Sequence, residues 1–320
     1  MENIYLPGDL QLKKGSPFLK GHMGGNEIVL VPRRDFPEKS RLELGLKVLQ
    51  PPHIGGDQLG LLYEGSGDSD LGVEIVDIHS RDYLPMCGGL TQVLGRAHRE
   101  LDLPELFNLD LSEPTDMLEL KTEIGIFPIK NSQDKGTTTV MDSFVEFAYE
   151  RGVEAGSVDG VSSFRIGDFF VTFVEEIRKK YPDASFSPLD RATKEILIGL
   201  QKKFRKEFAT PGENRDFAVM GERGNESSDG RVIFPHNLSE ESLEPTCGTG
   251  TVAVAVSLVE RGSIDGAGEL ELDFESGGSA ESIGGPEVTN VTMEVESGKV
   301  KRAKFSHSQV EILAFGELYL

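Results

Sequence analysis

The 320-residue sequence contains only two cysteines and six histidines, and this scarcity excludes two common kinds of structural support. Two thiols are too few for a disulfide scaffold. A structural zinc site needs about four cysteine or histidine ligands at close spacing. The histidines are scattered along the chain at His22, His53, His79, His98, His236 and His307. The sequence therefore predicts neither a disulfide framework nor a metal site.

Signals for bound nucleotides and for membranes are also missing from the sequence. It has no Walker-type phosphate loop and no Gly-x-Gly-x-x-Gly step after a strand, so we expect no cofactor. No apolar run approaches the ~20 residues that a membrane span needs. The first residues, Met1 to Pro7, have neither the basic start nor the apolar core of a secretory signal. We therefore expect no membrane partner and a cytoplasmic location.

Basic residues are few, with 33 lysines and arginines against 54 aspartates and glutamates, which gives a formal net charge of −21. A nucleic-acid partner is excluded on this ground, because phosphate backbones need a basic surface. If the substrate is an anion, a local device must overcome the negative field of the whole molecule.

The length of the chain predicts two domains, and its 38% hydrophobic content is typical of a globular protein. Short alternating or β-branched runs predict strands. We expect them at residues 27–31, 46–49, 59–63, 73–78, 169–174 and 269–274. The C-terminal region predicts further strands, with residues 291–295 pairing with residues 310–320 and Ser297-Gly298 forming a turn after the first of them.

Three segments have the pattern of helices. Leu90 to Glu100 follows the first cysteine, and Gly250 to Arg261 follows the second and ends at the stop signal Gly262. The second of these is apolar on all sides, which predicts a helix buried on every face. Asp190 to Phe208 has one apolar face, and its basic residues lie on the other, which predicts an outer helix with a solvated face.

The two cysteines occur in similar surroundings, 160 positions apart (247 − 87). Each is followed by glycine and then by a predicted helix: Cys87 by Gly88 and Gly89, and Cys247 by Gly248, Thr249 and Gly250. Strands, a Cys-Gly start, a helix and strands again thus occur twice. We expect two pseudo-symmetric halves of a mixed α/β (α+β) fold, each with a mixed β-sheet curled around one helix.

This placement indicates a chemistry for the thiols. The N–H groups and the dipole of a helix N-terminus favour a thiolate, which is the reactive form of cysteine. The exposed amides of the glycine-rich steps can bind a carboxylate from two sides. An α-carbon held between the two sulfurs could lose a proton to one and gain a proton from the other. The enolate-like charge would then develop beside amides already aimed at it.

Three other interpretations of the cysteines remain open. They could be packing residues, since a lone cysteine often behaves as a small buried hydrophobe. They could be a redox pair, although the sequence has no Cys-x-x-Cys motif. They could also mark a carboxylate-binding protein of the same fold that does not turn over its ligand.

The sequence resembles the proline racemase and hydroxyproline epimerase family, within the diaminopimelate epimerase-like fold group. The segments around the cysteines, residues 78–88 and 247–251, resemble the two cysteine motifs of the family. Supporting similarities occur at Gln50-Pro51-Pro52-His53, Gly167-Asp168-Phe169-Phe170 and Glu275-Ser276-Gly277-Gly278-Ser279, and Gly56-Asp57-Gln58-Leu59 resembles diaminopimelate epimerase. Together these segments span nearly the whole chain.

The resemblance implies a two-domain fold with a central helix in each half and the active site between them. We expect one half at residues 1–125, carrying Cys87 and completed by the strand at 306–320, and the other at residues 126–305, carrying Cys247. The family members with cysteine at both positions are racemases and epimerases that use neither pyridoxal phosphate nor another cofactor. Catalysis by Cys87 and Cys247 is therefore implied.

Other positions depart from the family pattern. Gly89 stands where the family has a histidine, Leu243 where it has an aspartate, and Thr210-Pro211 where it has a His-Pro step. In the family these residues contact the substrate amine, so proline itself is not the expected substrate. Asp168, Glu241 or Glu244 could replace those contacts, and each could equally be a solvated carboxylate.

We therefore expect an isomerase, a racemase or epimerase of an amino or imino acid. Its catalytic residues would be Cys87 and Cys247, and its substrate-binding residues would be Gly88, Gly89, Gly248, Thr249, Gly250 and Asp168. The expected partner is a small carboxylate, and the expected state is a monomer or a homodimer. An isomerase of an unsaturated carboxylic acid, which moves a proton between two carbons on the same fold, is the enzymatic alternative. The missing amine contacts favour it, and the intact thiol pair disfavours it.

Overall fold

The computed structural model describes residues 15–111, 116–132, 136–186, 189–208, 216–224, 226–235, 243–264, 266–276 and 287–319. The chain divides into two compact units, one formed by residues 1–139 and 310–320 and the other by residues 140–309. The first unit extends beyond the predicted end at residue 125, because the strand that begins there is the second arm of a hairpin.

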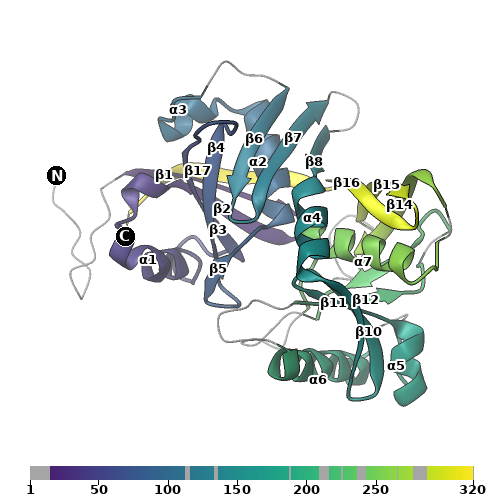
Figure 1. Cartoon of the computed structure of the whole chain (residues 1–320). Coiled ribbons are helices and arrows are strands. Elements are labelled where there is room, and N and C mark those ends of the chain that lie inside the picture. The colour runs from purple at the N-terminus through teal and green to yellow at the C-terminus, as the bar shows by residue number, and fades with distance from the viewer. Residues whose placement is uncertain are drawn as a thin grey trace. The chain divides into compact units, whose positions relative to one another are not determined.

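The first unit is a mixed sheet wrapped around one helix (Figure 1). Neighbouring strands pair in the order β17-β1-β2-β3-β4-β6-β7-β8, and the short β5 also pairs with β4. The strands are β1 (Ser16–Met23), β2 (Asn26–Pro32), β3 (Gln58–Glu64), β4 (Leu71–Asp77), β5 (Asp82–Leu84), β6 (Met117–Thr122), β7 (Gly125–Ser132), β8 (Gly136–Val140) and β17 (Val310–Leu318). The helices are α1 (Arg41–Val48), α2 (Gly88–Glu100) and α3 (Leu103–Phe107).

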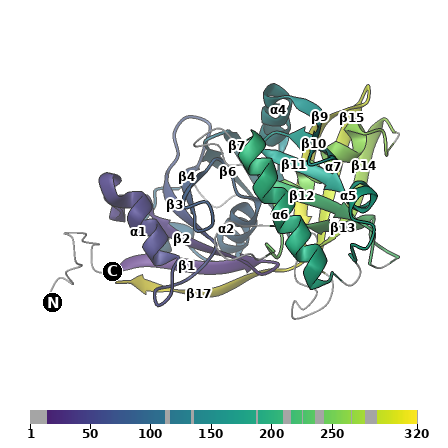
Figure 2. The ribbon, with the colours of Figure 1, turned by 90° about the horizontal axis from the view of Figure 1, so that it is seen from below.

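Helix α2 lies in the middle of this unit because its sheet curls around it. The helix contacts β17 and β1 at one end of the sheet order and β7 near the other. Figure 2 shows β17 beside β1, at the end of the sheet. Residues 88–95 and Ala97 are buried, so most of the helix surface belongs to the core.

The second unit repeats this architecture. Its strands pair in the order β9-β10-β11-β12-β13-β14-β15-β16. They are β9 (Val153–Val158), β10 (Val161–Ile166), β11 (Phe169–Phe173), β12 (Asp216–Gly221), β13 (Gly230–Ile233), β14 (Gly268–Ser276), β15 (Val288–Glu296) and β16 (Lys299–His307). The helices are α4 (Asp142–Arg151), α5 (Val174–Lys180), α6 (Arg191–Phe208) and α7 (Gly248–Glu260).

The two sheets also agree in strand direction. Read from β17 in the first unit and from β9 in the second, successive pairs are antiparallel, antiparallel, parallel, antiparallel, parallel, antiparallel and antiparallel. In both units the central helix connects the strands of the second parallel pair. The predicted internal duplication and the mixed α+β class are therefore confirmed.

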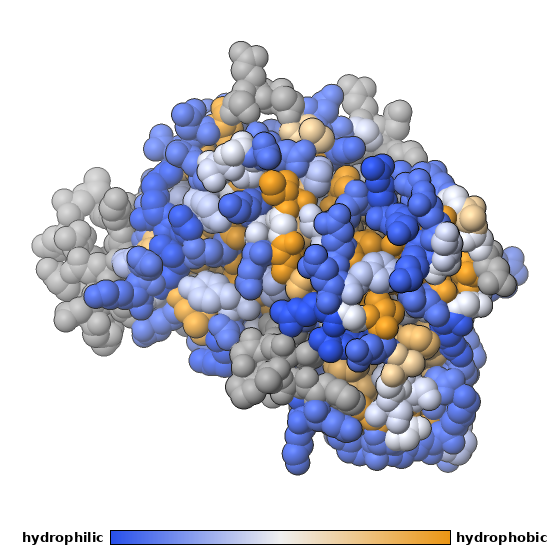
Figure 3. Space-filling view, viewed as in Figure 1, coloured by the Kyte–Doolittle hydropathy of each residue, from blue (hydrophilic) through white to orange (hydrophobic). Residues whose placement is uncertain are grey.

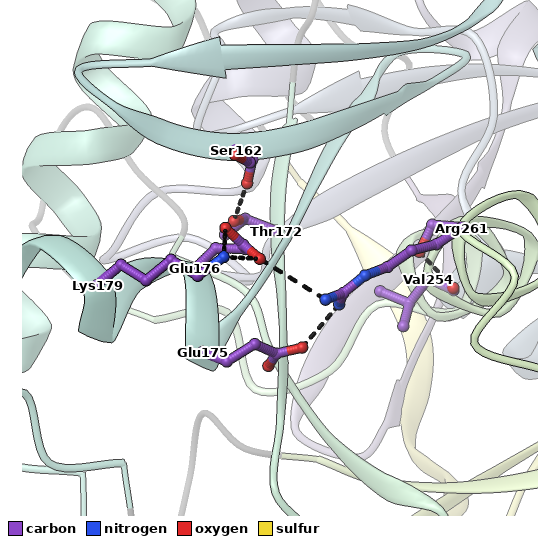
Figure 4. Close-up of polar contacts among 8 residues, drawn as sticks. Ser162, Thr172, Glu175, Glu176, Lys179, Val254 and Arg261 are labelled. Carbon is purple, nitrogen blue, oxygen red and sulfur yellow. Dashed lines mark hydrogen bonds and ion pairs between the residues drawn. The ribbon is translucent and has the colours of Figure 1, made fainter.

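Helix α7 is the core of the second unit. Residues 248–259 are all buried, as the apolar sequence predicts, and the helix contacts β10, β11, β12, β15 and β16. The helix ends before Gly262, whose φ of 69° is the left-handed conformation that glycine adopts readily after a helix. Beside it, Arg261 pairs with Glu175 (2.7 Å) and Glu176 (3.6 Å) of α5 (Figure 4).

Polar contacts attach the outer helices of the second unit. Tyr149 of α4 donates a hydrogen bond to Glu260 of α7 (2.6 Å). The pKa of the Tyr149 phenol is raised, mainly by burial and in second place by this hydrogen bond. Asp159, in the β9–β10 turn, pairs with Lys180 of α5 and Lys203 of α6. The hydrogen bond from Lys180, and after it the one from Lys203, lowers the pKa of the Asp159 carboxyl to about 2.

The inner face of α6 is apolar and buried, as predicted, with Leu197, Leu200 and Phe204 in the core.

One predicted strand and one predicted strand pairing are wrong. Residues 46–49 belong mostly to helix α1, whose buried residues Leu44, Gly45 and Val48 pack against the sheet. Residues 291–295 pair with β14 and β16 instead of with the C-terminal strand, which pairs with β1. The predicted Ser297-Gly298 turn is present, and it joins β15 to β16. The other predicted strands and the three predicted helices are present.

The face of the molecule in Figure 3 is mostly polar. Hydrophilic side chains cover most of the face shown in Figure 3. Among the helices in the described part of the chain, none has both the length and the apolar composition that crossing a membrane requires.

Candidate active site: two cysteine-capped helices

Cys87 is the N-cap residue of α2. Its backbone is extended (φ −139°, ψ 116°), and its sulfur accepts a hydrogen bond from the N–H of Leu90 at 3.4 Å. Its carbonyl accepts the N–H of Thr91 at 3.3 Å, which closes the first turn. The side chain therefore occupies the place that serine, threonine, aspartate or asparagine usually takes at a helix start.

Cys247 is the N-cap residue of α7 and has nearly the same geometry. Its φ of −140° and ψ of 110° match those of Cys87, and its sulfur accepts the N–H of Gly250 at 3.3 Å. Its carbonyl accepts the N–H of Thr251 at 2.9 Å. Both residues are thiols, and both sulfurs thus receive an N–H bond at the positive end of a buried helix.

The residues predicted to form an amide cradle directly follow each cysteine at the start of its helix. Gly88 and Gly89 form the first two positions of α2, and Gly248, Thr249 and Gly250 form the first three positions of α7. All of them are buried. The first amides of a helix have no acceptor in the preceding turn, and such a terminus suits an anion. In each unit, therefore, a cysteine and its glycine-rich step come together as a half-site.

Two aromatic rings border the half-site of Cys247. A Cβ atom on Gly250 would lie 2.5 Å from Cε1 of Phe234 and 2.9 Å from Cε1 of Phe169, so α7 approaches both rings closely. Asp168 directly precedes Phe169, is half-buried, and accepts the N–H of Asp216 at its carbonyl (2.9 Å). Glu244 is 9% exposed and donates its N–H to the carbonyl of Phe234 (2.9 Å). Asp168 and Glu244 are therefore backbone neighbours of these rings.

The close approach at Gly250 predicts the effect of a substitution there. Gly250→Ala should lower the free energy of unfolding by about 1–3 kcal/mol, because the added methyl group overpacks against the two rings. Gly89→Ala is the matched control, since its nearest neighbours (Asn26 and Ile28) lie 3.5 Å from an added Cβ. Urea denaturation of both variants measures the difference. Equal effects of the two substitutions would contradict the close packing at Gly250.

Cys87 has polar neighbours that sequence reasoning did not identify. The thiol donates to Oε1 of Gln58 at 3.8 Å, and Nε2 of Gln58 donates to Oδ1 of Asp77 at 2.9 Å. Gln58 begins β3 and Asp77 ends β4, where the two residues are cross-strand partners. The sequence feature that could have identified them is a polar residue, Gln58 or Asp77, at one end of each of two apolar strands.

A second polar pair lies beside it. Nε2 of His79 is 3.0 Å from Oδ1 of Asp57, and Oδ2 of Asp57 accepts the N–H of Glu27 at 2.7 Å. Asp57 adjoins Gln58 in the chain, and His79 follows Asp77 by two residues. Two Asp-centred pairs thus form at the ends of β3 and β4.

Of the positions that depart from the family pattern, Leu243 is a core residue of the second unit, 8% exposed. Gly89 is buried at the start of α2. Thr210-Pro211 and Glu241 lie outside the described residues.

Among the described residues, neither a metal-ligand cluster nor the pocket given below includes a cysteine. Within the described ranges, no three His, Cys, Asp or Glu side chains gather as metal ligands would. A pocket of about 440 Å³ lies between the end of α2 and α3. Its lining residues are His98, Arg99, Glu100, Leu101, Asp102, Pro104 and Leu111. It is at the opposite end of α2 from Cys87, about 18 Å away along the helix, so it does not belong to the half-site.

Comparison with known proteins supports a fold and no more than a fold. No protein-family model matches the sequence, and no curated protein matches it. A hydroxyproline epimerase from Agrobacterium vitis, solved with trans-4-hydroxy-L-proline, is similar in structure with a TM-score of 0.63 and 13% identity. The similarity covers 97% of this chain and 92% of that one.

Two further structures belong to the same comparison. A probable proline racemase from Agrobacterium radiobacter K84 has a TM-score of 0.63 and 12% identity, covering 95% of this chain and 93% of that one. A methylitaconate Δ-isomerase has a TM-score of 0.57 and 14% identity, covering 95% of each chain. The protein therefore has the fold that proline racemase, hydroxyproline epimerase and methylitaconate isomerase share, as the two cysteine motifs predicted.

Proposed function

We propose that the protein is a cofactor-independent racemase or epimerase that inverts the α-carbon of an amino or imino acid, with Cys87 and Cys247 as its acid–base pair. One observation carries the proposal: each cysteine caps the central helix of one of two repeated units with the same dihedral angles and the same N–H bond to sulfur. A packing role does not account for this match, because cysteine is not a preferred helix cap.

The proposed reaction needs one thiolate and one thiol. The thiolate takes the α-proton from one face of the carbon, and the electron pair of the C–H bond moves toward the carboxylate. The thiol then gives its proton to the opposite face, so one proton leaves and one arrives while the two sulfurs exchange protonation states. Amides of Gly88, Gly89, Gly248 and Thr249 would hold the carboxylate and stabilise the charge that develops on it, while the N–H of Gly250 donates to the sulfur of Cys247.

The residues around the half-sites bear on the substrate. Leu243 lies in the core and Gly89 has no side chain, so neither can hold an ammonium group as the family residues do. Asp168 and Glu244, beside the rings that pack on α7, are the acidic residues we propose for that contact. A substrate other than proline follows from this difference.

A second candidate is an isomerase of an unsaturated carboxylic acid, which would move a proton between two carbons with the same thiols. The similarity to methylitaconate Δ-isomerase favours it, as does the apolar Leu243 at the place of an amine contact. Such a substrate needs the carboxylate cradle and no amine contact at all.

The test is a solvent-exchange experiment. The purified protein is incubated in D₂O with a panel of amino acids, imino acids and unsaturated carboxylic acids, and the products are followed by NMR. Deuterium at the α-carbon together with the opposite enantiomer supports the racemase, and a displaced double bond supports the isomerase. Thermal stabilisation by a carboxylate without any exchange would overturn both and indicate a binding protein.

A further inference from the structure

Three buried groups form a hydrogen-bonded chain that ends at Cys87. The thiol donates to Gln58 Oε1 (3.8 Å), and Gln58 Nε2 donates to Asp77 Oδ1 (2.9 Å). Asp77 Oδ2 accepts the N–H of Ser80 at 2.6 Å. Cys87, Gln58 and Asp77 are 8%, 3% and 1% exposed, so water competes little with these bonds. Hydrogen bonds made in such a low-dielectric setting have a large effect on charge.

Asp77 decides which end of the Gln58 amide faces the sulfur. A carboxylate only accepts hydrogen bonds, so it selects the NH₂ end of the amide. The amide oxygen is therefore directed at Cys87. An oxygen in that position accepts the S–H of a thiol and repels the negative charge of a thiolate.

We propose that Asp77 is a positioning residue that acts through Gln58 to hold Cys87 as a thiol, so that Cys87 is the acid and Cys247 the base of the resting enzyme. The assignment of Cys87 as acid and Cys247 as base rests on the proposed function. The claim that Gln58 and Asp77 hold Cys87 as a thiol does not depend on that function. The arrangement makes a symmetric pair of thiols unequal before the substrate binds. The resting enzyme would then be ready for the enantiomer whose α-proton faces Cys247.

The strands β3 and β12, which take the same place in the two sheets, begin with different residues. Gln58 is the first residue of β3 and lies opposite Ile28 of β2. Asp216 is the first residue of β12 and lies opposite Phe169 of β11. Asp216 carries a carboxylate, and that carboxylate pairs with Arg205 at 3.0 Å. One of these strands thus begins with an amide and the other with a carboxylate.

Three ion pairs lie close to the strands that surround α2. On the strands packed against the helix and on the adjoining loops, the ion pairs are Lys20 with Glu27 (2.7 Å), His22 with Glu311 (3.6 Å) and His79 with Asp57 (3.0 Å). Gln58 is hydrogen-bonded to the sulfur, and Asp77 is bonded to Gln58. We therefore expect the protonation state of Cys87 to respond to Gln58 directly and to Asp77 through Gln58.

The experiment titrates Cys87 by itself, in protein that carries Cys247→Ser. Thiolate ultraviolet absorbance and the rate of alkylation by iodoacetamide are measured against pH. Three variants are compared in this background: Asp77→Asn, Gln58→Leu and, as the matched control, Asp70→Asn. Asp70 is also an aspartate of the first unit that accepts a backbone N–H, from Glu119 at 2.8 Å. Circular dichroism establishes that each variant is folded.

Asp77→Asn should invert the polarity at the sulfur. The asparagine oxygen can keep the Ser80 N–H, and its NH₂ group then selects the oxygen of Gln58, which turns the NH₂ of Gln58 toward Cys87. A donor in place of an acceptor favours the thiolate, so the midpoint should fall by about one pH unit, a tenfold rise in the thiolate-to-thiol ratio. Gln58→Leu removes the acceptor and should lower the midpoint less, while Asp70→Asn should leave it unchanged.

An unchanged or higher midpoint in folded Asp77→Asn overturns the proposal, as does an equal fall in Asp70→Asn. If Asp77→Asn does not fold, an unchanged or higher midpoint of Cys87 in folded Gln58→Leu overturns the proposal. If neither folds, the two single-thiol proteins Cys247→Ser and Cys87→Ser decide, since Cys87 must titrate at a higher pH than Cys247. A shifted midpoint in a protein that inverts no substrate would support the positioning role and end the proposed function.

Discussion

Replacing either cysteine by serine should slow inversion of the substrate α-carbon by about 10²–10⁴-fold while leaving the protein folded. A serine hydroxyl does not supply a base near neutral pH, and loss of one acid–base group typically costs about 10²–10⁴-fold in rate. The fold should survive because serine is a preferred N-cap residue and accepts the same N–H bond that Leu90 or Gly250 gives to sulfur.

Three measurements check this prediction: inversion by polarimetry, α-proton exchange in D₂O by NMR, and the melting temperature. Cys87→Ser and Cys247→Ser should melt within a few degrees of the wild type. The double variant should show no exchange at all. Exchange that persists in the double variant would remove the thiols from the mechanism, even if the protein proves to be a racemase.

Glu275→Gln should strongly destabilise the protein, lowering the free energy of unfolding by about 3–5 kcal/mol. Glu275 is 2% exposed and pairs with Arg231 at 3.1 Å. It also accepts hydrogen bonds from the N–H of Gly224 and from the hydroxyl of Ser228. Removing the carboxylate leaves the Arg231 guanidinium, which is mostly buried, without its countercharge.

A surface ion pair provides the matched control for this prediction. Arg191 and Glu195 of α6 are 3.1 Å apart with side chains 92% and 66% exposed, so Glu195→Gln should change the free energy of unfolding by less than about 1 kcal/mol. Denaturation by guanidinium chloride measures both variants. If Glu275→Gln costs no more than Glu195→Gln, the buried pair does not stabilise the second unit.

The position of Glu275 also changes the interpretation of its segment. The sequence offered Glu275-Ser276-Gly277-Gly278 only as a similarity to the family. The structure shows Glu275 on β14, where its carboxylate contacts Arg231 of the neighbouring strand β13 and Gly224 and Ser228 before that strand. Its contacts are those of a structural residue.

The wrong strand assignment at residues 46–49 has a physical cause. Leu42, Leu44, Leu46 and Val48 alternate with other residues, and this period of two predicts a strand. In the structure Gly45 faces the sheet, where a Cβ would lie 3.0 Å from Val76 and 3.1 Å from Leu59. A helix can approach the sheet this closely because Gly45 has no side chain, so packing overrode the local pattern.

The wrong pairing of the C-terminal strand has another cause. Residues 291–295 and 310–320 both have the composition of strands, and nearness in the chain favoured pairing them with each other. Instead β17 pairs with β1, which lies near the other end of the sequence, and completes the first unit. Strand partners depend on which edge lacks a neighbour in the folded unit, and local sequence does not carry that information.

The sequence by itself determined the two cysteine-capped helices and the burial of α7. An N-cap bond joins residues three apart, and burial on all sides follows from an apolar helix surface, so both are written in short stretches of chain. Only the tertiary structure decided what faces the sulfur of Cys87. Gln58 and Asp77 lie 29 and 10 residues from it in the chain, and strand pairing brings them together there. The proposed chemistry thus rests on local sequence, and the proposed inequality of the two thiols rests on the fold.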